Sequence, residues 1–326
     1  MKLKCFLLSL SLILSCTFTA CEQKNTPHKV TGIYFDTVVE LTVYGEKVPE
    51  EALELCEKYE LLFSATNEES ELYKLNNHGT LQVSKETLEV VKTALEFSRD
   101  SGDLFCIAIL PVSKLWDFTA ENPKLPSKKS LTSALKSVSS ENIIIEGNRI
   151  TLKNGATIDL GAIAKGYIAD KIAELYKEKN LSGIINLGGN ILTVGEKPNK
   201  EAYKVGVKKP FSEEENLCTL ELGEAAVATC GVYERYFEIN GKIYHHIIDP
   251  TTGYPRKSGL HSVTVIDKSS TVADALSTTL FMMGEKEANK YLANRPDTHA
   301  VFVRDDGSVS FSKGFENAKI VKVAKQ

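Results

Sequence analysis

The spacing of hydrophobic and polar residues changes several times along the chain, and each spacing predicts a different type of element. Residues 31–45 alternate apolar and polar side chains and include several β-branched residues, which is typical of a β-strand. Residues 49–64 and 84–100 place apolar side chains at helical intervals, and Ser84 is a suitable N-cap for the second helix. Further helices are predicted at residues 129–138, 162–178, 270–284 and 285–295.

Short strands dominate the rest of the chain. Residues 142–160 predict three strands joined by Gly-Asn and Asn-Gly turns, and residues 183–196 predict two strands broken at Gly188 and Gly189. More strands are predicted at residues 202–208, 218–222, 225–229, 234–240, 242–248 and 260–267, with two or three more within 299–322. Helices and strands alternate without a regular βαβ rhythm or an internal repeat. This order favours a single α+β domain with mostly antiparallel sheet.

The N-terminus predicts a targeting segment outside that domain. Two lysines precede an apolar stretch that is too short to span a bilayer, and small Ala20 stands directly before Cys21. We interpret residues 1–20 as a lipoprotein signal peptide, Cys21 as the lipid-carrying residue, residues 21–29 as a tether and residues 30–326 as the folded domain. The alternative is an ordinary signal peptide followed by a chance cysteine.

Composition narrows the class of protein. Hydrophobic residues make up 42% of the chain and charged residues 25%, as in ordinary soluble globular proteins. The formal net charge of -4, without a basic run, does not indicate a nucleic-acid partner. The cysteines beyond residue 20 have no CxxC spacing, which argues against zinc and against a dense disulfide framework. We expect them to act as small buried hydrophobes.

The stretch "IDLGAIAKGYIAD" is the first candidate for chemistry. It contains Asp159, Gly161 and Lys165 where a strand-like segment turns into a helix. A helix N-terminus offers free N–H groups to an anion, and Lys165 adds a positive charge. The stretch matches neither a P-loop nor a dinucleotide fingerprint. An ordinary turn with a solvated lysine is therefore the alternative interpretation.

The stretch "HHIIDPTTGYP" is the second candidate. Its two adjacent histidines, His245 and His246, point to opposite faces if they lie on a strand, so at most one faces a given pocket. Residues 249–253 have the composition of a turn. A single histidine is more often structural than catalytic.

The stretch "ADALSTTLFMMG" is the third candidate. Asp274 and Thr278 stand four residues apart on a predicted helix, so their oxygens lie on one face. A carboxylate on such an apolar helix needs a partner, and together the two oxygens could ligate a hard cation such as Mg²⁺. The alternative is a satisfied polar pair without a metal.

Taken together, "IDLGAIAKGYIAD", "INLGGNI", "YERYFEINGKIYHHIIDPTTGYP" and "ADALSTTLFMMG" resemble the ApbE family of bacterial FAD:protein FMN transferases. The resemblance runs in the same order from about residue 31 to 313. It implies a T-fold-like α+β domain with largely antiparallel sheets and packed helices. It also implies a lipoprotein held on the extracytoplasmic, periplasmic side of a bacterial membrane.

The resemblance further implies a reaction and its residues. FAD is bound, its pyrophosphate is cleaved with Mg²⁺, AMP leaves, and FMN is joined to a Thr of an acceptor protein such as a membrane redox subunit. The metal ligands would be Asp274, Thr278 and the backbone carbonyl of Ala162. The FAD contacts would be Phe35, Leu104, Phe105, Cys106, Asp159, Lys165 and His246. The catalytic residues would be Asp274, as a ligand rather than a base, with Lys165 stabilising developing charge and His246 as the candidate general base.

Two cysteines depart from the family pattern. Cys106 replaces a group that can hydrogen-bond, and Cys230 stands where the family often has Ser. Two other activities therefore stay open beside FMN transfer. One is an FAD pyrophosphatase that releases FMN and AMP, and the other is a flavin-binding lipoprotein without chemistry, which would have no need of Asp274 together with Thr278.

Overall fold

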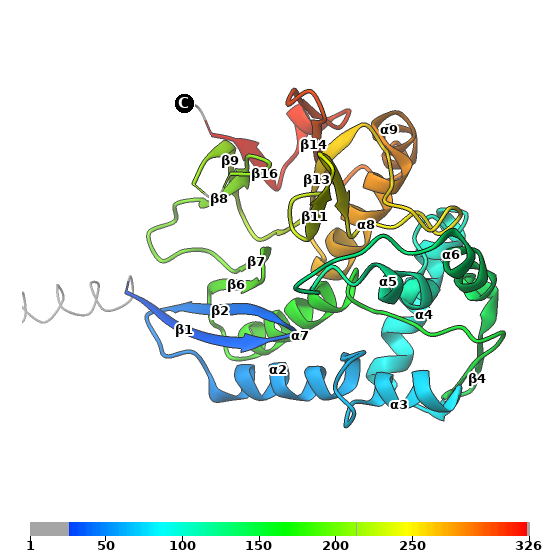
Figure 1. The fold of residues 1–326 in the computed structure, drawn as a ribbon. Coiled ribbons are helices and arrows are strands. Elements are labelled where there is room, and N and C mark those ends of the chain that lie inside the picture. Colours follow the sequence, from blue (N-terminus) through cyan, green and yellow to red (C-terminus); the bar gives the residue numbers. More distant parts are fainter. Residues whose placement is uncertain (1–25, 213, 325–326) are drawn as a thin grey trace, which may run out of the picture.

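The computed structural model describes residues 26–212 and 214–324 (Figure 1). The predicted signal peptide and the lipid-carrying Cys21 lie outside the described residues. The first strand starts at Pro27, so the folded domain includes the last residues of the expected tether. Within the described ranges, every helix is too short or too polar to cross a membrane.

An eight-stranded antiparallel sheet forms the centre of the molecule. Its strands follow the order β1-β2-β6-β7-β10-β13-β14-β15. Their bounds are β1 Pro27–Tyr34, β2 Thr37–Tyr44, β6 Gly183–Leu187, β7 Asn190–Val194, β10 Ala226–Gly231, β13 Leu260–Asp267, β14 His299–Arg304 and β15 Val309–Phe311. The predicted α+β class with antiparallel pairing is confirmed.

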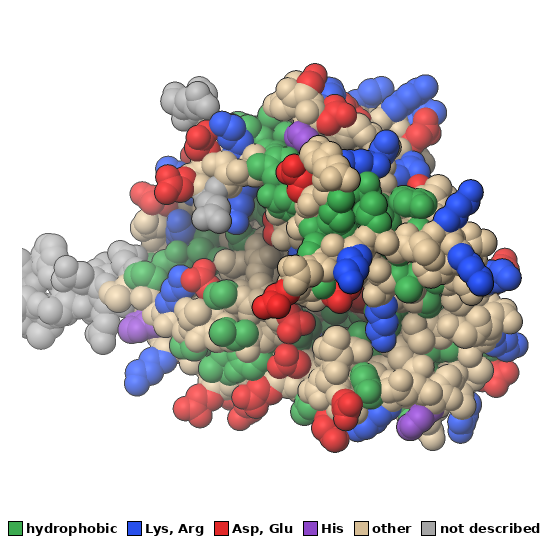
Figure 2. All heavy atoms as spheres, viewed as in Figure 1, with side chains coloured by type: hydrophobic (Ala, Val, Ile, Leu, Met, Phe, Trp, Pro, Cys, Tyr) green, Lys and Arg blue, Asp and Glu red, His purple; other side chains and the backbone are tan. Residues whose placement is uncertain are grey.

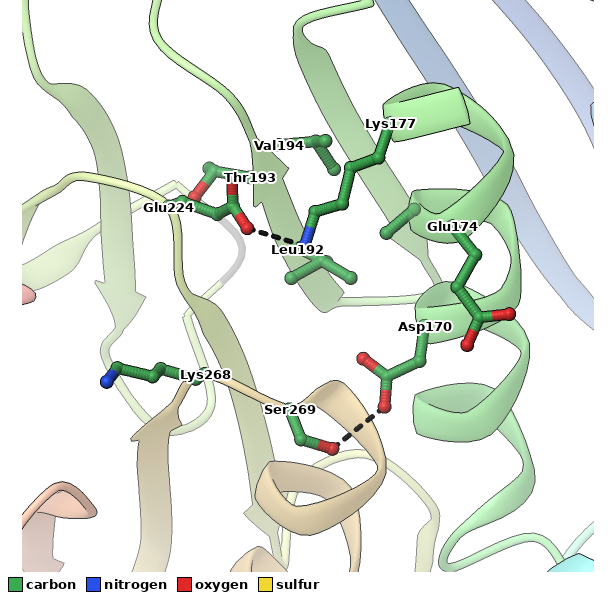
Figure 3. A pocket seen from close by; sticks show the side chains of 10 residues that line it. Asp170, Glu174, Lys177, Leu192, Thr193, Val194, Glu224, Lys268 and Ser269 are labelled. Carbon is green, nitrogen blue, oxygen red and sulfur yellow. Dashed lines mark hydrogen bonds and ion pairs between the residues drawn. The ribbon is translucent and has the colours of Figure 1, made fainter. Parts of the chain in front are cut away.

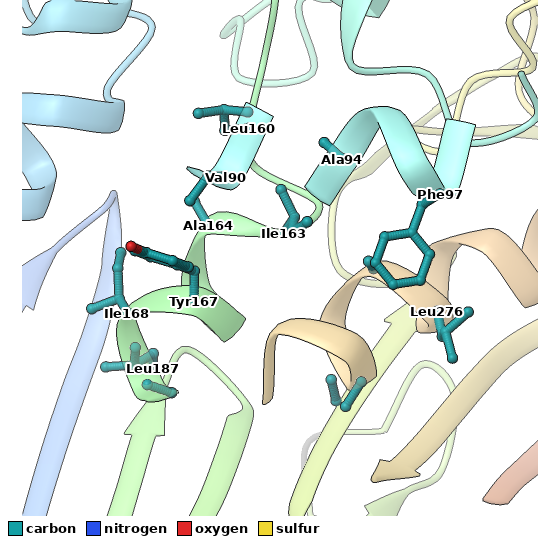
Figure 4. Packing of buried hydrophobic residues seen from close by; sticks show 14 of the residues in the cluster. Val90, Ala94, Phe97, Leu160, Ile163, Ala164, Tyr167, Ile168, Leu187 and Leu276 are labelled. Atoms are coloured by element: carbon teal, nitrogen blue, oxygen red, sulfur yellow. The ribbon is translucent and has the colours of Figure 1, made fainter. Parts of the chain in front are cut away.

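Helices α7 (Ala164–Glu178) and α8 (Ser270–Met283) pack against this sheet and against each other. The other α-helices are α2 Glu50–Phe63, α3 Glu71–His78, α4 Lys85–Asp100, α5 Leu110–Trp116, α6 Lys128–Ala134 and α9 Glu285–Leu292. The start of α7 is anchored by the buried side chains of Ile163 and Ala164, which lie among apolar residues from α4 and α8 (Figure 4). Ser84 caps α4 as predicted, because its side chain accepts the N–H of Thr87.

Three small sheets surround the central one. Their strands are β3 Thr80–Gln82, β4 Ile143–Glu146 and β5 Arg149–Leu152; β8 Tyr203–Lys208, β9 Asn216–Leu222 and β16 Val321–Val323; and β11 Tyr236–Ile239 with β12 Lys242–His245. Short 3₁₀ turns occur at η1 Ile107–Ile109, η2 Leu135–Ser137, η3 Ser140–Asn142 and η4 Phe315–Asn317. The described cysteines, Cys56, Cys106, Cys218 and Cys230, are free thiols, as expected.

Two predicted strand patterns were wrong. Residues 31–45 do not form one strand, because Phe35 and Asp36 adopt left-handed φ values of 56° and 55° and reverse the chain between β1 and β2. The turn has no glycine at either left-handed position, so it lacks the usual sequence signal of a tight hairpin. The third strand expected within 142–160 is also absent. Ile158 is buried as in a strand, but its N–H donates to the side chain of Asn76 at 2.7 Å and its carbonyl accepts from the same side chain at 2.9 Å.

Candidate functional site

The first turn of α7 and one face of α8 meet at a glycine. A Cβ placed on Gly166 would overlap the carbonyl oxygen of Ser270 and lie 2.7 Å from the Cβ of Asp274. Only glycine lets the two helices approach this closely without displacement. The close approach explains why the residue before Tyr167 is glycine. It also brings into contact two stretches that lie about a hundred residues apart in the sequence.

Asp274 lies at the centre of this contact. Its side chain is 5% exposed, and its Oδ2 accepts the backbone N–H of Gly166 at 2.9 Å. The first N–H groups of a helix lack partners within the helix, and a carboxylate at that end is stabilised by the helix dipole. The sequence predicted that this acid needs a partner, and in the structure that partner is the N-terminus of α7.

The carbonyl of Ala162 is left available by the same hydrogen bond. A regular helix start would direct the Gly166 N–H back to Ala162, but that N–H donates to Asp274 instead. Within residues 26–212 and 214–324, no backbone N–H donates to the Ala162 carbonyl and no acceptor takes the N–H of Lys165. The first turn of α7 thus presents one carbonyl and one N–H group without backbone partners.

The loop before α7 is held by its own polar groups. Asp159 Oδ1 accepts the N–H of Gly161 at 2.7 Å, and the N–H of Asp159 donates to the carbonyl of Ile107 at 2.8 Å. Lys165 Nζ donates to the carbonyl of Gly161 at 3.1 Å. The lysine therefore folds back over the loop that precedes its own helix.

Thr278 lies next to Cys230 of β10. Burial raises the pKa of the Cys230 thiol to about 12, a hydrogen bond with Thr278 opposes that rise, and the Asp274 carboxylate adds to it. The charge of Lys165 also acts on this thiol and lowers its pKa. Thr278 is thus within hydrogen-bonding reach of this buried cysteine, and the charges of Asp274 and Lys165 are near enough to act on its thiol.

The charge of Lys165 also acts on His246. Burial lowers its pKa to about 4, and the charges of Arg235 and Lys165 act in the same direction. Its Nδ1 lies 3.1 Å from the carbonyl oxygen of Arg235, and its ring meets Phe118 edge to face. His245 is 9% exposed and meets Phe281 of α8 edge to face, with ring centroids 6.0 Å apart, and burial lowers its pKa to about 4.

The remaining predicted FAD contacts lie on neighbouring segments. Phe35 occupies the turn of the β1–β2 hairpin, where its N–H donates to Glu60 Oε1 at 3.2 Å. Phe105 is 2% exposed and packs against Phe97, so its ring belongs to the core. Leu104 and Cys106 are partly buried beside it, and burial raises the pKa of the Cys106 thiol to about 12. Among the described residues, no hydrogen bond or ion pair joins these four to Asp274, and their roles stay predictions.

One residue at the contact was missed by sequence reasoning. Asp170 of α7 accepts hydrogen bonds from the first turn of α8. The N-cap role of Ser269 is readable from its position before a helical stretch, whereas an acid that caps a different helix gives no local signal.

The two helices that meet here carry oxygen donors of three kinds: the Asp274 carboxylate and the Thr278 hydroxyl on α8, and the Ala162 carbonyl just before α7. Such a set fits a hard cation that keeps several waters and takes further oxygens from a substrate phosphate. Within residues 26–212 and 214–324, no group of three or more His, Cys, Asp or Glu side chains is arranged to hold a metal. A cation here would therefore be held by fewer than three such side chains, with Asp274 among them.

Two hollows lie near the contact. The face in Figure 2 is hollowed near its middle, between the β1–β2 hairpin and the part of the molecule that carries β11 and β12. A separate cavity of about 280 Å³ is lined by α7, β7 and the segment before α8, and it includes Asp170 and Ser269 (Figure 3). None of Asp274, Thr278, Lys165 and His246 lines this cavity, so we do not assign the predicted chemistry to it.

Comparisons with known proteins give a consistent result. The model of the ApbE family matches residues 35–302. The FAD:protein FMN transferase of Klebsiella pneumoniae (strain 342) is 32% identical over 298 residues, which is 88% of this chain and 92% of that protein. The FAD:protein FMN transferase of Treponema pallidum (strain Nichols) is 32% identical over 286 residues, 81% of this chain and 79% of that protein. The crystal structure of the ApbE protein from Thermotoga maritima superposes with a TM-score of 0.83 and 34% identity, covering 90% of this chain and 99% of that one.

Proposed function

The chain belongs to the ApbE family, and we propose that it is an FAD:protein FMN transferase. The observation that carries the proposal is the pairing of Asp274 with the first turn of α7, which leaves the Ala162 carbonyl available beside a buried carboxylate. In the proposed reaction, a Thr hydroxyl oxygen of an acceptor protein bonds to the phosphorus of the FMN half of FAD. The bond from that phosphorus to the bridging oxygen breaks, AMP leaves with that oxygen, and the hydroxyl proton passes to a base.

Asp274, Thr278 and the Ala162 carbonyl would hold a Mg²⁺ ion at the α7–α8 contact. When bound, the ion would supply charge neutralisation on the diphosphate of FAD. The Gly166 N–H fixes one oxygen of Asp274 at 2.9 Å, so the carboxylate is oriented before any ligand arrives. Preorganisation of this kind lowers the cost of arranging charged groups during the reaction.

Lys165 and the N-terminus of α7 suit the phosphate groups themselves. The N–H of Lys165 has no acceptor among the described residues, and helix N-termini favour anions. The ammonium group of Lys165 donates to Gly161, on the loop that precedes the same helix. We assign Lys165 to the charge that develops on the leaving phosphate.

We assign His246 as the base for the acceptor hydroxyl, and it is a weak base because burial lowers its pKa. A pKa of about 4 keeps its ring neutral near pH 7. The Arg235 carbonyl can only accept a hydrogen bond, so the ring nitrogen that lies 3.1 Å from it carries the proton. The other nitrogen, Nε2, is then unprotonated and able to accept a proton.

The proposal includes the location of the protein. Residues 1–20 would be removed, Cys21 would carry lipid, and the domain would face the extracytoplasmic side of a bacterial membrane. An acceptor there would be a membrane redox subunit with an accessible Thr. Globomycin, which blocks the cleavage of lipoprotein signal peptides, tests this part of the proposal. The Cys21→Ala variant should escape the block and leave the membrane fraction. An unchanged distribution of this variant between membrane and soluble fractions would contradict lipidation.

The enzymatic proposal is tested with FAD, Mg²⁺ and a Thr-containing acceptor. We expect AMP release together with a covalently fluorescent acceptor, and loss of both when the acceptor Thr is replaced by Val. AMP and free FMN in the absence of acceptor would instead identify an FAD pyrophosphatase. Bound FAD without any AMP would identify a flavin-binding protein and would contradict the proposal.

A further inference from the structure

We propose that Asp170 is a positioning residue, which locks α8 onto α7 and thereby aims Asp274 and Thr278 at the first turn of α7. The proposal rests on the proposed function, because it concerns the same site. It goes further by assigning a role to a carboxylate outside the proposed set of metal and phosphate ligands. Its basis is the set of hydrogen bonds between the two helices.

Asp170 binds the start of α8 with both of its oxygens. Oδ1 accepts the N–H of Ser270 at 2.8 Å, while Oδ2 accepts the N–H of Thr271 at 2.9 Å and its hydroxyl at 2.7 Å. Oδ2 also accepts the hydroxyl of Ser269 at 2.8 Å (Figure 3). Four donors from three consecutive residues therefore converge on one side chain.

These bonds complete the first turn of α8. Ser269 accepts the N–H of Val272 with its side chain at 3.3 Å and the N–H of Ala273 with its carbonyl at 3.0 Å. With Asp170 taking the two preceding N–H groups, no N–H at this helix start is left without a partner. The Asp170 carboxylate thus satisfies the two N–H groups that the local cap, Ser269, leaves without partners.

The capping is reciprocal between the helices. Asp170 of α7 caps α8, and Asp274 of α8 accepts the Gly166 N–H at the start of α7. Each acid also lies on the face of its own helix that meets the other. Gly166 and Asp170 are four residues apart on α7, and the same interval separates Ser270, Asp274 and Thr278 on α8.

Because of this spacing, the cap that Asp170 provides at the start of α8 also positions Asp274 and Thr278. Residues at intervals of four share one face of a helix, so any rotation of α8 that moves Ser270 also moves Asp274 and Thr278. Asp170 fixes the N–H of Ser270, and Gly166 accommodates the carbonyl of Ser270. The orientation of the candidate ligands is therefore set one turn earlier, at a point outside the site.

The test measures cation binding rather than turnover alone. Binding of Mn²⁺, a hard cation that also prefers oxygen ligands, is followed by electron paramagnetic resonance in the wild type and in Asp170→Asn. Asparagine keeps the shape but replaces one acceptor oxygen by a donor. We expect the Kd for Mn²⁺ to rise about tenfold to a hundredfold, which is typical when a residue that orients a metal ligand is altered. Thr271→Val, which removes one of the four bonds, should give a smaller rise in the same direction.

Ser84→Ala is the matched control, because it removes a serine cap from α4, away from the α7–α8 contact. It should lower the melting temperature without changing the Kd for Mn²⁺. Equal Kd values for Asp170→Asn, Thr271→Val and the wild type would overturn the positioning role. Wild-type binding no tighter than that of Asp274→Asn would instead contradict the proposed metal site itself, so the two failures are distinguishable.

Discussion

The α7–α8 contact and the aromatic cluster around Trp116 are both buried, but different interactions hold them together. In the cluster, Trp116 packs against Tyr244 with ring centroids 5.6 Å apart, and its indole N–H donates to the Gly253 carbonyl at 2.7 Å. The other buried members are apolar or aromatic: Val112, Leu131, Phe237 and Ile248. At the α7–α8 contact, two carboxylates and a glycine determine how the helices meet.

The difference separates stability from positioning. Apolar burial is non-directional and scales with area, so the cluster holds its neighbours together without fixing a particular atom. A buried carboxylate bonded to helix N–H groups is directional, and losing one partner leaves the other unsatisfied. Substitutions in the cluster should therefore act mainly on the free energy of unfolding, and those at the contact mainly on ligand binding and turnover.

The largest expected effect is at Asp274. Asp274→Asn keeps an oxygen for the Gly166 N–H but removes the charge, and we expect AMP release to fall about a thousandfold, within the range seen when a charge-stabilising group is lost. Chromatography of AMP measures this, and circular dichroism checks that the variant is folded. The exposed control Asp305→Asn should retain full activity. Normal turnover by Asp274→Asn would remove this residue from the site.

Leu131→Ala tests the other region. Leu131 is 2% exposed in the Trp116 cluster, and a truncation of this kind costs about 2–5 kcal/mol of unfolding free energy. Urea denaturation measures the loss. Activity per folded molecule should stay close to that of the wild type. A variant of normal stability with impaired turnover would reverse the assignment of the two regions.

For Gly166→Ala, two physical effects predict changes of opposite sign in the free energy of unfolding. Helix propensity alone predicts stabilisation by about 1 kcal/mol, because alanine is the better helix former. The collision with Ser270 and Asp274 predicts destabilisation by about 1–3 kcal/mol instead. We expect the second outcome in chemical denaturation. Gly223, where an added Cβ meets nothing within 4 Å, is the control and should change little on substitution by alanine.

The most gradual effect concerns pH. Burial lowers the pKa of His245 to about 4, so between pH 6.5 and about 4 the unfolded chain binds a proton at this residue that the folded chain does not. The free energy of unfolding should therefore fall as the pH drops through this window, by up to about 3 kcal/mol from His245. His245→Gln should flatten the curve of unfolding free energy against pH. An unchanged slope would show that His245 is not held neutral by burial.

Local signals predicted much of the fold. Ser84 and the helical spacing after it located α4, and the paired glycines at residues 188 and 189 located the β6–β7 turn. The hairpin at Phe35 and Asp36 was missed because neither residue is a glycine, although both adopt left-handed φ values. The false strand near Ile158 arose because burial alternates there while a side chain, Asn76, takes the hydrogen bonds.

Some residues of the candidate site could likewise be predicted from the sequence, and others could not. Asp274 and Thr278 could be paired from their spacing, since an interval of four residues has a fixed meaning on a helix. The partners Gly166 and Asp170 could not be assigned, because their roles depend on how two helices distant in sequence cross. The sequence indicated that the acid needed a partner, and only the packing of the helices identified it.

Crystals of the protein grown with FAD and Mn²⁺ test the central claim most directly, through the anomalous scattering of the metal. We predict a peak in contact with Asp274, Thr278 and the Ala162 carbonyl, at ligand distances of about 2.1 Å and with phosphate oxygens completing the shell. A metal peak elsewhere in the molecule, in crystals of protein that releases AMP from FAD, would contradict the account.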